Sequence, residues 1–338
     1  MSSVIISSHD QKHIARIFMQ EQRINAIYNK MISDVSLILK RYKDSGSKNI
    51  WIRNKEIERE LDRYLGEFNK VIEQEIRSGA LKSWDLSNDK NDKLVKAFIK
   101  NMSVSDIVKE GMMQRNADAF DAFINRIEDG MNLSGNVWHI TKQTKVNIEL
   151  YLSSGIGTGR SAERIARDIK ELLYNPDARF RRIRDKNGNL VPSAPMANYN
   201  PGQGIYRSAR MNAVRLAGTE INMAYRTADQ ERWSRLDFVL GYEVLRSQNH
   251  HVCAICDALV GKYPKEFIFQ GWHPFCICYA VPVMMDNDEF ADYLLSDNNS
   301  SEQTIKNIPD NARKFFNDNP KYMEKSYAGK ANKDLFQK

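Results

Sequence analysis

Apolar residues recur every three or four positions along most of the first 150 residues, which is the spacing of an amphipathic α-helix. One stripe runs over residues 14–42 and a second over 57–76, with a polar break at 44–47 between them. Further helical segments are predicted at three places: from Leu94, over 119–127, and over 138–152. Such stripes are typical of helix packing, so they predict an elongated helical region and indicate no chemistry.

A long helix with a face of small residues is predicted over 206–235. Alanine recurs along it at Ala209, Ala213, Ala217, Ala224 and Ala228. Glu220 lies on the same side of this helix, where it is placed to pair with a basic group. A β-like alternation over 238–247 follows. The expected order is therefore a long helix, a short strand and then the cysteines.

A glycine cluster occupies residues 155–159. A helical pattern precedes it and Arg160-Ser161 follows, whereas a phosphate-binding loop needs a preceding strand and a Gly-Lys-Ser/Thr ending. We therefore expect a hinge here, with Ser161 capping the helix that comes next.

Residues 175–206 form the least regular stretch and carry a basic run: Arg179, Arg181, Arg182, Arg184 and Lys186. Asn187-Gly188 predicts a hairpin turn, and three prolines mark an exposed loop or arm. One interpretation is a solvated hairpin. The other is an arginine-rich arm that contacts a phosphate backbone or an acidic protein.

The strongest chemical signal is a cluster of metal-ligand residues near the C-terminal end. Cys253 and Cys256 form a C-x-x-C knuckle, a spacing that lets two thiolates meet on one tetrahedral ion. His273 and Cys276 repeat the same three-residue spacing, and Cys278 follows. Two such pairs separated by a loop predict one zinc ion per chain. Gly261 and Gly271 lie where that loop has to turn.

Five good ligands compete for four coordination positions. Cys253, Cys256 and Cys276 are the firmest, and the fourth ligand is either His273 or Cys278. His250 and His251 are expected on the surface or behind the ligands. No open coordination position is evident, which favours structural over catalytic zinc. Two disulfides, or free thiols, are the alternative to a metal.

Composition narrows the classes of protein that fit this pattern. The 338 residues are 42% hydrophobic and carry a formal net charge of +7, so a core can form and a nucleic-acid partner is permitted but not required. No apolar run approaches the length of a membrane span, and the first residues lack a signal-peptide pattern. We expect a protein that stays in the compartment where it is made, with no membrane partner.

The stretch from 209 to 283 resembles the phage head morphogenesis domain, the Mu F-like domain of minor head proteins. The resemblance rests on Ala217-Gly218-Thr219-Glu220, Cys253 and Cys256, Leu259-Val260-Gly261, His273-Pro274-Phe275-Cys276-Ile277-Cys278, and upstream Gly159-Arg160-Ser161, Ile165-Ala166 and Ile169. Gly218 and Ile277 replace arginines usual in that family, which puts any contact made by those arginines in doubt.

This resemblance implies a minor head protein of a tailed bacteriophage. Its expected partners are the portal protein, the major capsid or scaffolding protein, and packaged double-stranded DNA. Its expected place is the portal vertex or head interior of the virion, and the host cytoplasm during assembly. It would assist head assembly and DNA packaging or ejection without being an enzyme. The alternatives are a zinc-containing nuclease, in which His250 and His251 would act, and a toxin-linked phage protein.

Together these features predict a mainly α protein with a small β element. We expect a helical N-terminal region over 1–153, offering a docking surface for portal or capsid. An α+β head morphogenesis domain closed by a zinc knuckle is expected over 154–285, with Glu220 and Gly261 in structural roles. A polar, partly ordered tail over 286–338 is expected to order on a partner.

Overall fold

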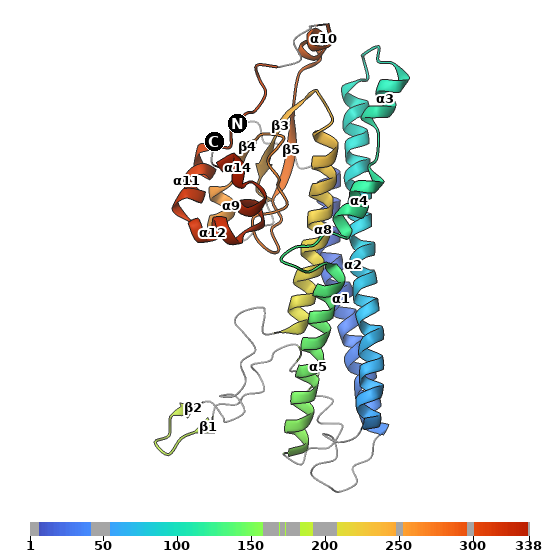
Figure 1. Ribbon diagram of the computed structural model, residues 1–338, viewed down its shortest axis with the longest axis vertical. Helices are drawn as coiled ribbons and strands as arrows, with labels where there is room; N and C mark the ends of the chain where they lie inside the picture. The colour runs from blue at the N-terminus through green and yellow to red at the C-terminus, as the bar shows by residue number, and fades with distance from the viewer. Residues whose placement is uncertain are drawn as a thin grey trace. The chain divides into compact units, whose positions relative to one another are not determined.

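The computed structural model describes residues 7–41, 55–157, 183–191, 208–247, 253–295 and 301–336, together with Ile169 and Leu173. This part of the chain is mostly helical and holds one three-stranded antiparallel sheet, so the predicted α+β class is confirmed (Figure 1). No described helix is long and apolar enough to cross a membrane.

The chain divides into two compact units, each built from separated segments. Unit 1 comprises 1–18, 78–125 and 218–338, and unit 2 comprises 19–77 and 126–217. The predicted domains are consecutive stretches of the chain with boundaries at 153 and 285, whereas each of these units is built from stretches that alternate along the sequence. The three consecutive domains stay a prediction.

Unit 2 is helical. It contains most of α1 (Ser8–Arg41), the first half of α2 (Lys55–Phe98), α5 (Leu133–Gly157) and the start of α8 (Ala209–Trp233). Tyr28 lies fully buried at its centre, donates a 3.2 Å hydrogen bond to the Ala209 carbonyl, and packs edge-on against Phe68. The apolar stripes predicted over 14–42 and 57–76 supply buried residues of α1 and α2, so both helices form where their periodicity predicts.

The sheet of unit 1 has the strand order β4-β3-β5, in which β3 (Val239–Leu245) lies between β4 (Gly261–Tyr263) and β5 (Tyr279–Met284). Tyr242 is aligned with Tyr263 on one side and with Pro282 on the other. A bulge between Val239 and Gly241 shifts the register. The strand predicted over 238–247 is therefore confirmed, and it is the central one.

Helices complete unit 1 around this sheet. They are α3 (Asp106–Met112), α4 (Ala117–Ile124), α9 (Ala254–Ala258), α10 (Asn287–Leu295), α11 (Asp310–Asp318), α12 (Pro320–Lys325), α13 (Tyr327–Ala331) and α14 (Lys333–Phe336), besides parts of α1, α2 and α8. Phe98 from α2 stacks on Phe238 with ring centroids 3.9 Å apart, and Phe290 of α10 meets both rings edge-on. One aromatic core thus joins α2, the sheet and α10.

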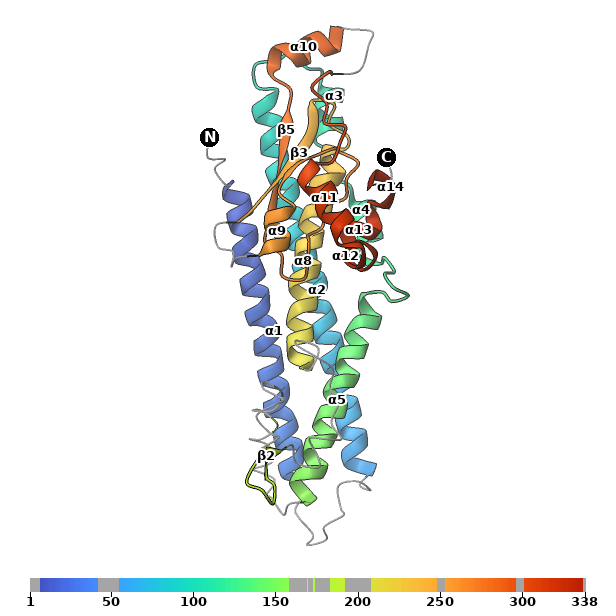
Figure 2. The ribbon, with the colours of Figure 1, turned by 90° about the vertical axis from the view of Figure 1, so that its left-hand side faces the viewer.

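Residues 301–336 lie in the stretch predicted as a polar, partly ordered tail, and they form short helices that are part of unit 1. Figure 2 shows α11, α12, α13 and α14 gathered together. Ile308, Ala312 and Phe316 are buried in the same core as the sheet. The segment is polar overall, but its few apolar side chains pack on an existing aromatic surface, which stabilises short helices without a partner.

The separate segment predicted to begin at Leu94 is also wrong, because α2 runs unbroken to Phe98. Ser87, Asn88, Lys90 and Asn91 interrupt the apolar stripe, yet the first two and Asn91 are buried and Lys90 is nearly so. Their side chains bond to backbone carbonyls of α2 itself or to residues of α1 and α8. Polar residues therefore occupy core positions in this part of α2. The spacing of apolar residues cannot reveal a buried helix face that is made of polar residues.

Two other expectations concern the middle of the chain. Helix α5 continues to Gly157, so the first part of the predicted hinge is helical, and Ser161 lies outside the described residues. The predicted hairpin is confirmed: β1 (Ile183–Arg184) pairs with β2 (Leu190–Val191), and Gly188 has φ of 81° in the turn. Asn187 and Gly188 can adopt such turn conformations with little strain.

Candidate metal centre

The first ligand pair lies at the start of α9. Cys253 precedes this helix in an extended conformation, and its carbonyl accepts the first helical hydrogen bond from the Asp257 amide at 2.9 Å. Cys256 lies one turn later and is fully buried. The predicted C-x-x-C knuckle therefore takes the form of a helix N-terminus, where the partial positive charge of free amides favours thiolates.

The second pair is held by a tight turn. The Cys276 amide donates to the His273 carbonyl at 3.0 Å, Pro274 occupies the second position, and Phe275 has φ of 62° in the third. These are the features of a type II turn, in which the third position usually carries glycine. Phenylalanine in this conformation is strained, and strained residues tend to occur where a local geometry has to be held.

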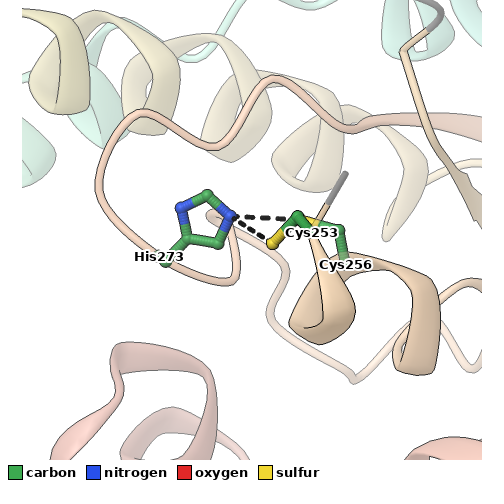
Figure 3. A group of neighbouring side chains, drawn as sticks. All are labelled: Cys253, Cys256 and His273. Carbon is green, nitrogen blue, oxygen red and sulfur yellow. Dashed lines mark hydrogen bonds between the residues drawn. The ribbon is translucent and has the colours of Figure 1, made fainter. Parts of the chain in front are cut away.

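The same turn orients the imidazole of His273. Its Nδ1 lies 2.7 Å from the Pro274 carbonyl oxygen, which accepts only, so Nδ1 carries the proton. The lone pair is then on Nε2, and Figure 3 shows this atom facing the thiols of Cys253 and Cys256. A histidine fixed through one ring nitrogen and offering the other is the usual arrangement of a metal ligand.

The five predicted ligands form two groups that share Cys256. One is Cys253, Cys256 and His273, and the other is Cys256, Cys276 and Cys278; within each group the donor atoms lie within 4.8 Å of one another. His273 Nε2 is 3.3 Å from Cys253 Sγ and 3.1 Å from Cys256 Sγ. A tetrahedral zinc ion with ordinary bond lengths needs a sulfur–nitrogen separation of about 3.6 Å. Shifts of about half an ångström would therefore fit the ion.

None of the four cysteines forms a disulfide bond, which is contrary to the alternative of two disulfides. Cys276 and Cys278 are almost fully buried, like Cys256. Hydrogen bonds with Cys276 and Cys278, together with burial, raise the pKa of Cys256 far above the ordinary thiol range. A bound cation would reverse this effect, because thiolate ligands lose their protons when they bind a metal. The donor set thus fits a soft or borderline metal ion.

Three polar residues of α8 hold the loop that carries the second ligand pair. Asn222 Nδ2 donates to the Cys276 carbonyl at 2.6 Å, and Gln230 Nε2 donates to the Phe267 carbonyl at 2.9 Å. Between them, the Arg226 guanidinium donates to the carbonyls of Gln270, Cys276 and Cys278 at 2.8, 2.7 and 2.6 Å. Residues four apart lie on one face of a helix. This face therefore supplies hydrogen-bond donors to the backbone carbonyls of an irregular loop, which no regular ladder of backbone amides satisfies.

Gly271 is required by this arrangement. A Cβ at this position would lie 2.4 Å from Arg226 Nη1, and the residue has φ of 117°. The guanidinium also lies over the ring of Phe269, with its central carbon 4.8 Å from the ring centroid. Gly271 therefore lies at the predicted turn and also allows the close approach of a buried arginine.

The C-terminal helices hold the other side of the loop. Asn332 bonds to both the amide and the carbonyl of Ile268, at 2.6 and 2.9 Å, and the Tyr322 hydroxyl donates to the Trp272 carbonyl. Gly261 begins β4 with φ of 144°, and a Cβ there would lie 2.8 Å from Pro309 Cγ. These contacts give Gly261 a structural role that only glycine suits.

Of the remaining predicted residues, those that the structure describes belong to neither donor group. Arg184 and Lys186 are exposed on the β1–β2 hairpin, where Arg184 donates to the Gly188 carbonyl at 2.7 Å. Glu220 is buried in α8. Arg179, Arg181, Arg182, His250 and His251 lie outside the described residues.

Sequence reasoning missed Asn222, Arg226 and Gln230. Their signal is present in the chain as polar residues at intervals of four along α8, but other polar residues surround them on the same helix. That signal has a specific meaning only once an irregular loop of exposed carbonyls is known to lie against the helix.

Comparison with known proteins found no match to this chain among family models, curated proteins or solved structures.

Proposed function

We propose that this chain binds one structural zinc ion through Cys253, Cys256, His273 and Cys276. The observation that carries this proposal is the convergence of thiol and imidazole donors from two separate turns. Cys276 is favoured as the fourth ligand because it shares a tight turn with His273. Cys278 is the competing donor for that place or for the place of His273.

The zinc ion would join the start of α9 to the turn at 273–276, two segments that β4 and an irregular loop separate in the chain. Cys256 and His273 are 17 positions apart in the chain, and the loop over 264–278 has little regular structure. Its backbone depends on side chains of α8 and of the C-terminal helices. A metal bridging the two segments would supply the rigidity that a larger hydrophobic contact supplies elsewhere.

We further propose that the protein is a non-enzymatic minor head protein of a tailed bacteriophage. Support comes from the order of motifs described above: a small-residue helix, a short strand, a C-x-x-C knuckle and an H-P-x-C-x-C terminus. The proposed partners are the portal protein, the major capsid or scaffolding protein, and packaged DNA, and the proposed place is the virion. The role would be to assist head assembly and DNA packaging or ejection.

Metal analysis tests the first proposal. The purified full-length chain should contain about one zinc per molecule, and a chelator should remove it and lower the melting temperature. The chain expressed with Cys253 and Cys256 both replaced by serine is expected to contain none. The variant Cys276→Ser should lose most of its zinc. A wild-type chain without metal at any stage of purification would contradict the proposal.

Co-expression with portal protein from the same phage genome tests the second proposal. The chain should co-purify with the portal oligomer. Incubation of the purified chain with plasmid and Mg²⁺ or Mn²⁺ should leave the DNA intact. Metal-dependent nicking that His250→Ala and His251→Ala abolish would replace the structural role with the nuclease alternative.

A further inference from the structure

A hydrogen-bonded chain links the start of α1 to the loop that carries the metal ligands. Within unit 1, His13 Nε2 lies 2.9 Å from Asn222 Oδ1, and Asn222 Nδ2 donates to the Cys276 carbonyl at 2.6 Å. His13 and Asn222 are both buried. The amide nitrogen of Asn222 is committed to Cys276, so its oxygen faces His13 and His13 has to donate from Nε2.

Apolar contacts follow the same path. Ile17 of α1, Ile221 of α8 and Ile277 form a small buried cluster, and Ile277 lies between Cys276 and Cys278. A cavity of about 10 Å³, which has room for about one water molecule, is lined by residues of α1 and α8 and by residues 277–280. The residues immediately after Cys276 therefore form one wall of the site on which α1 packs.

The other attachments of this part of α1 go to α2 and α8. Asp10 accepts from Tyr225 at 2.8 Å and from Lys90 at 3.2 Å, and the His13 ring stacks on Tyr225 at 3.9 Å between centroids. These contacts orient the helix. The closure of its inner face, however, depends on the position of the backbone at Cys276 and Ile277, which the metal would fix.

We propose that metal binding at the cysteine–histidine centre controls the docking of residues 8–18 of α1 in unit 1. This inference rests on the proposed zinc site and extends it from a local clasp to a regulator of the first three turns of α1. With metal, Cys276 holds its carbonyl toward Asn222, and Asn222 holds His13. Without metal, the turn at 273–276 loses its anchor, and the backbone shift withdraws both the acceptor for Asn222 and the wall formed by Ile277.

Hydrogen exchange of the full-length chain, measured by mass spectrometry with and without a zinc chelator, tests this coupling. Amides over residues 8–18 should exchange at least tenfold faster in the zinc-free protein. Amides over residues 57–76 of unit 2 serve as the internal reference and should keep their rates. Zinc content is measured on the same samples, so a chain that binds no zinc contradicts the proposed function, and a zinc-binding chain without the change in exchange contradicts only the coupling.

Matched variants separate the relay from general loosening of the loop. Asn222→Ala should raise exchange over 8–18 in the zinc-loaded protein and shrink the difference that the chelator makes. His13→Phe keeps an aromatic ring against Tyr225 but removes the bond to Asn222, so it should act in the same direction. Gln230→Ala removes bonds from α8 to the Lys265 and Phe267 carbonyls of the same loop, and it should keep the full difference.

Two outcomes would overturn the coupling. One is equal exchange over 8–18 with and without zinc in a folded protein. The other is a uniform rise across both regions, which would show global unfolding in place of local release of α1.

Discussion

Lys90 Nζ lies 2.5 Å from Asp229 Oδ2 in the interior of unit 1, where the two side chains are 11% and 4% exposed. The same ammonium group lies 3.2 Å from Asp10 Oδ1 and sits over the ring of Tyr225 at 4.6 Å from its centroid. Burial alone would lower the pKa of Lys90, but the carboxylates of Asp229 and Asp10 raise it. One buried cation therefore serves two buried carboxylates from different helices.

Replacing Lys90 with methionine should destabilise the protein by about 3–5 kcal/mol, because it leaves two carboxylates buried without a cation. Urea denaturation followed by circular dichroism measures the change. The control is Lys93→Met on the same helix, where the side chain is exposed, and its effect should stay below about 0.5 kcal/mol.

Adding Asp229→Asn to Lys90→Met removes one of the two unpaired charges and should recover part of the loss. Equal stability of Lys90→Met and the wild type would show that the cluster carries no net electrostatic dependence on its cation.

The shared position of Cys256 predicts which ligands are indispensable. Cys256 belongs to both donor groups, so Cys256→Ser should abolish zinc binding. Cys278→Ser should keep about one zinc per chain, and His273→Asn should lose most of it, because the oriented Nε2 of His273 completes the favoured set. Zinc content after dialysis measures all three. Zinc retained in His273→Asn but lost in Cys278→Ser would establish the all-thiolate set.

The sequence predicted which cysteine and histidine side chains come together, but it did not predict the residues that hold their loop in place. The reason is physical. Ligand spacing such as Cys253–Cys256 is a local property of the backbone, so the sequence carries it directly. The loop is held by hydrogen bonds with Asn222 and Asn332. Both residues are distant from it along the chain, and asparagine is common at positions with no such role. Their role depends on a tertiary contact that no local pattern encodes.

The same distinction separates the parts of the fold that the sequence predicted from those that it did not. Apolar periodicity predicted α1 and the start of α2 because apolar residues form their buried faces. It failed at Ser87 and Asn91, whose buried polar groups are satisfied across helices by Asp229. It failed again after 300, where Phe316 and Ala328 are too sparse to form a stripe but are buried against aromatic residues.

The burial of His13 predicts a dependence of stability on pH. Burial lowers the pKa of His13 to about 3, and the charges of Arg226 and Lys90 act in the same direction, while the bond to Asn222 and the charge of Asp10 oppose the shift without cancelling it. Tyr225 stacks on the ring. The unfolded chain binds a proton at His13 below about pH 6.5, while the folded chain does not until about pH 3. The contribution is therefore fully present above pH 6.5 and is lost as the pH falls toward 3.

Within that window His13 should reduce the free energy of unfolding by about 1.4 kcal/mol for each pH unit of acidification. His13→Phe should flatten this slope, and urea denaturation between pH 4 and 7 measures it. His139→Gln is the control, because His139 is exposed on α5 and should leave the slope unchanged. An identical slope in wild type and His13→Phe would assign the acid sensitivity to other groups.

Arg226 should be irreplaceable by lysine despite the shared charge. Its planar guanidinium reaches the carbonyls of Gln270, Cys276 and Cys278 at once, and a lysine ammonium on a different geometry cannot bond to all three. Arg226→Lys should therefore destabilise the zinc-loaded protein by about 2–3 kcal/mol, since buried carbonyls would lose charged donors. Arg235→Lys is the matched control, because Arg235 is exposed just after the end of α8 and pairs with Glu231 of that helix. If both substitutions cost the same in urea denaturation, the guanidinium of Arg226 would contribute only its charge, and the loop would be held by Asn222, Asn332 and the metal.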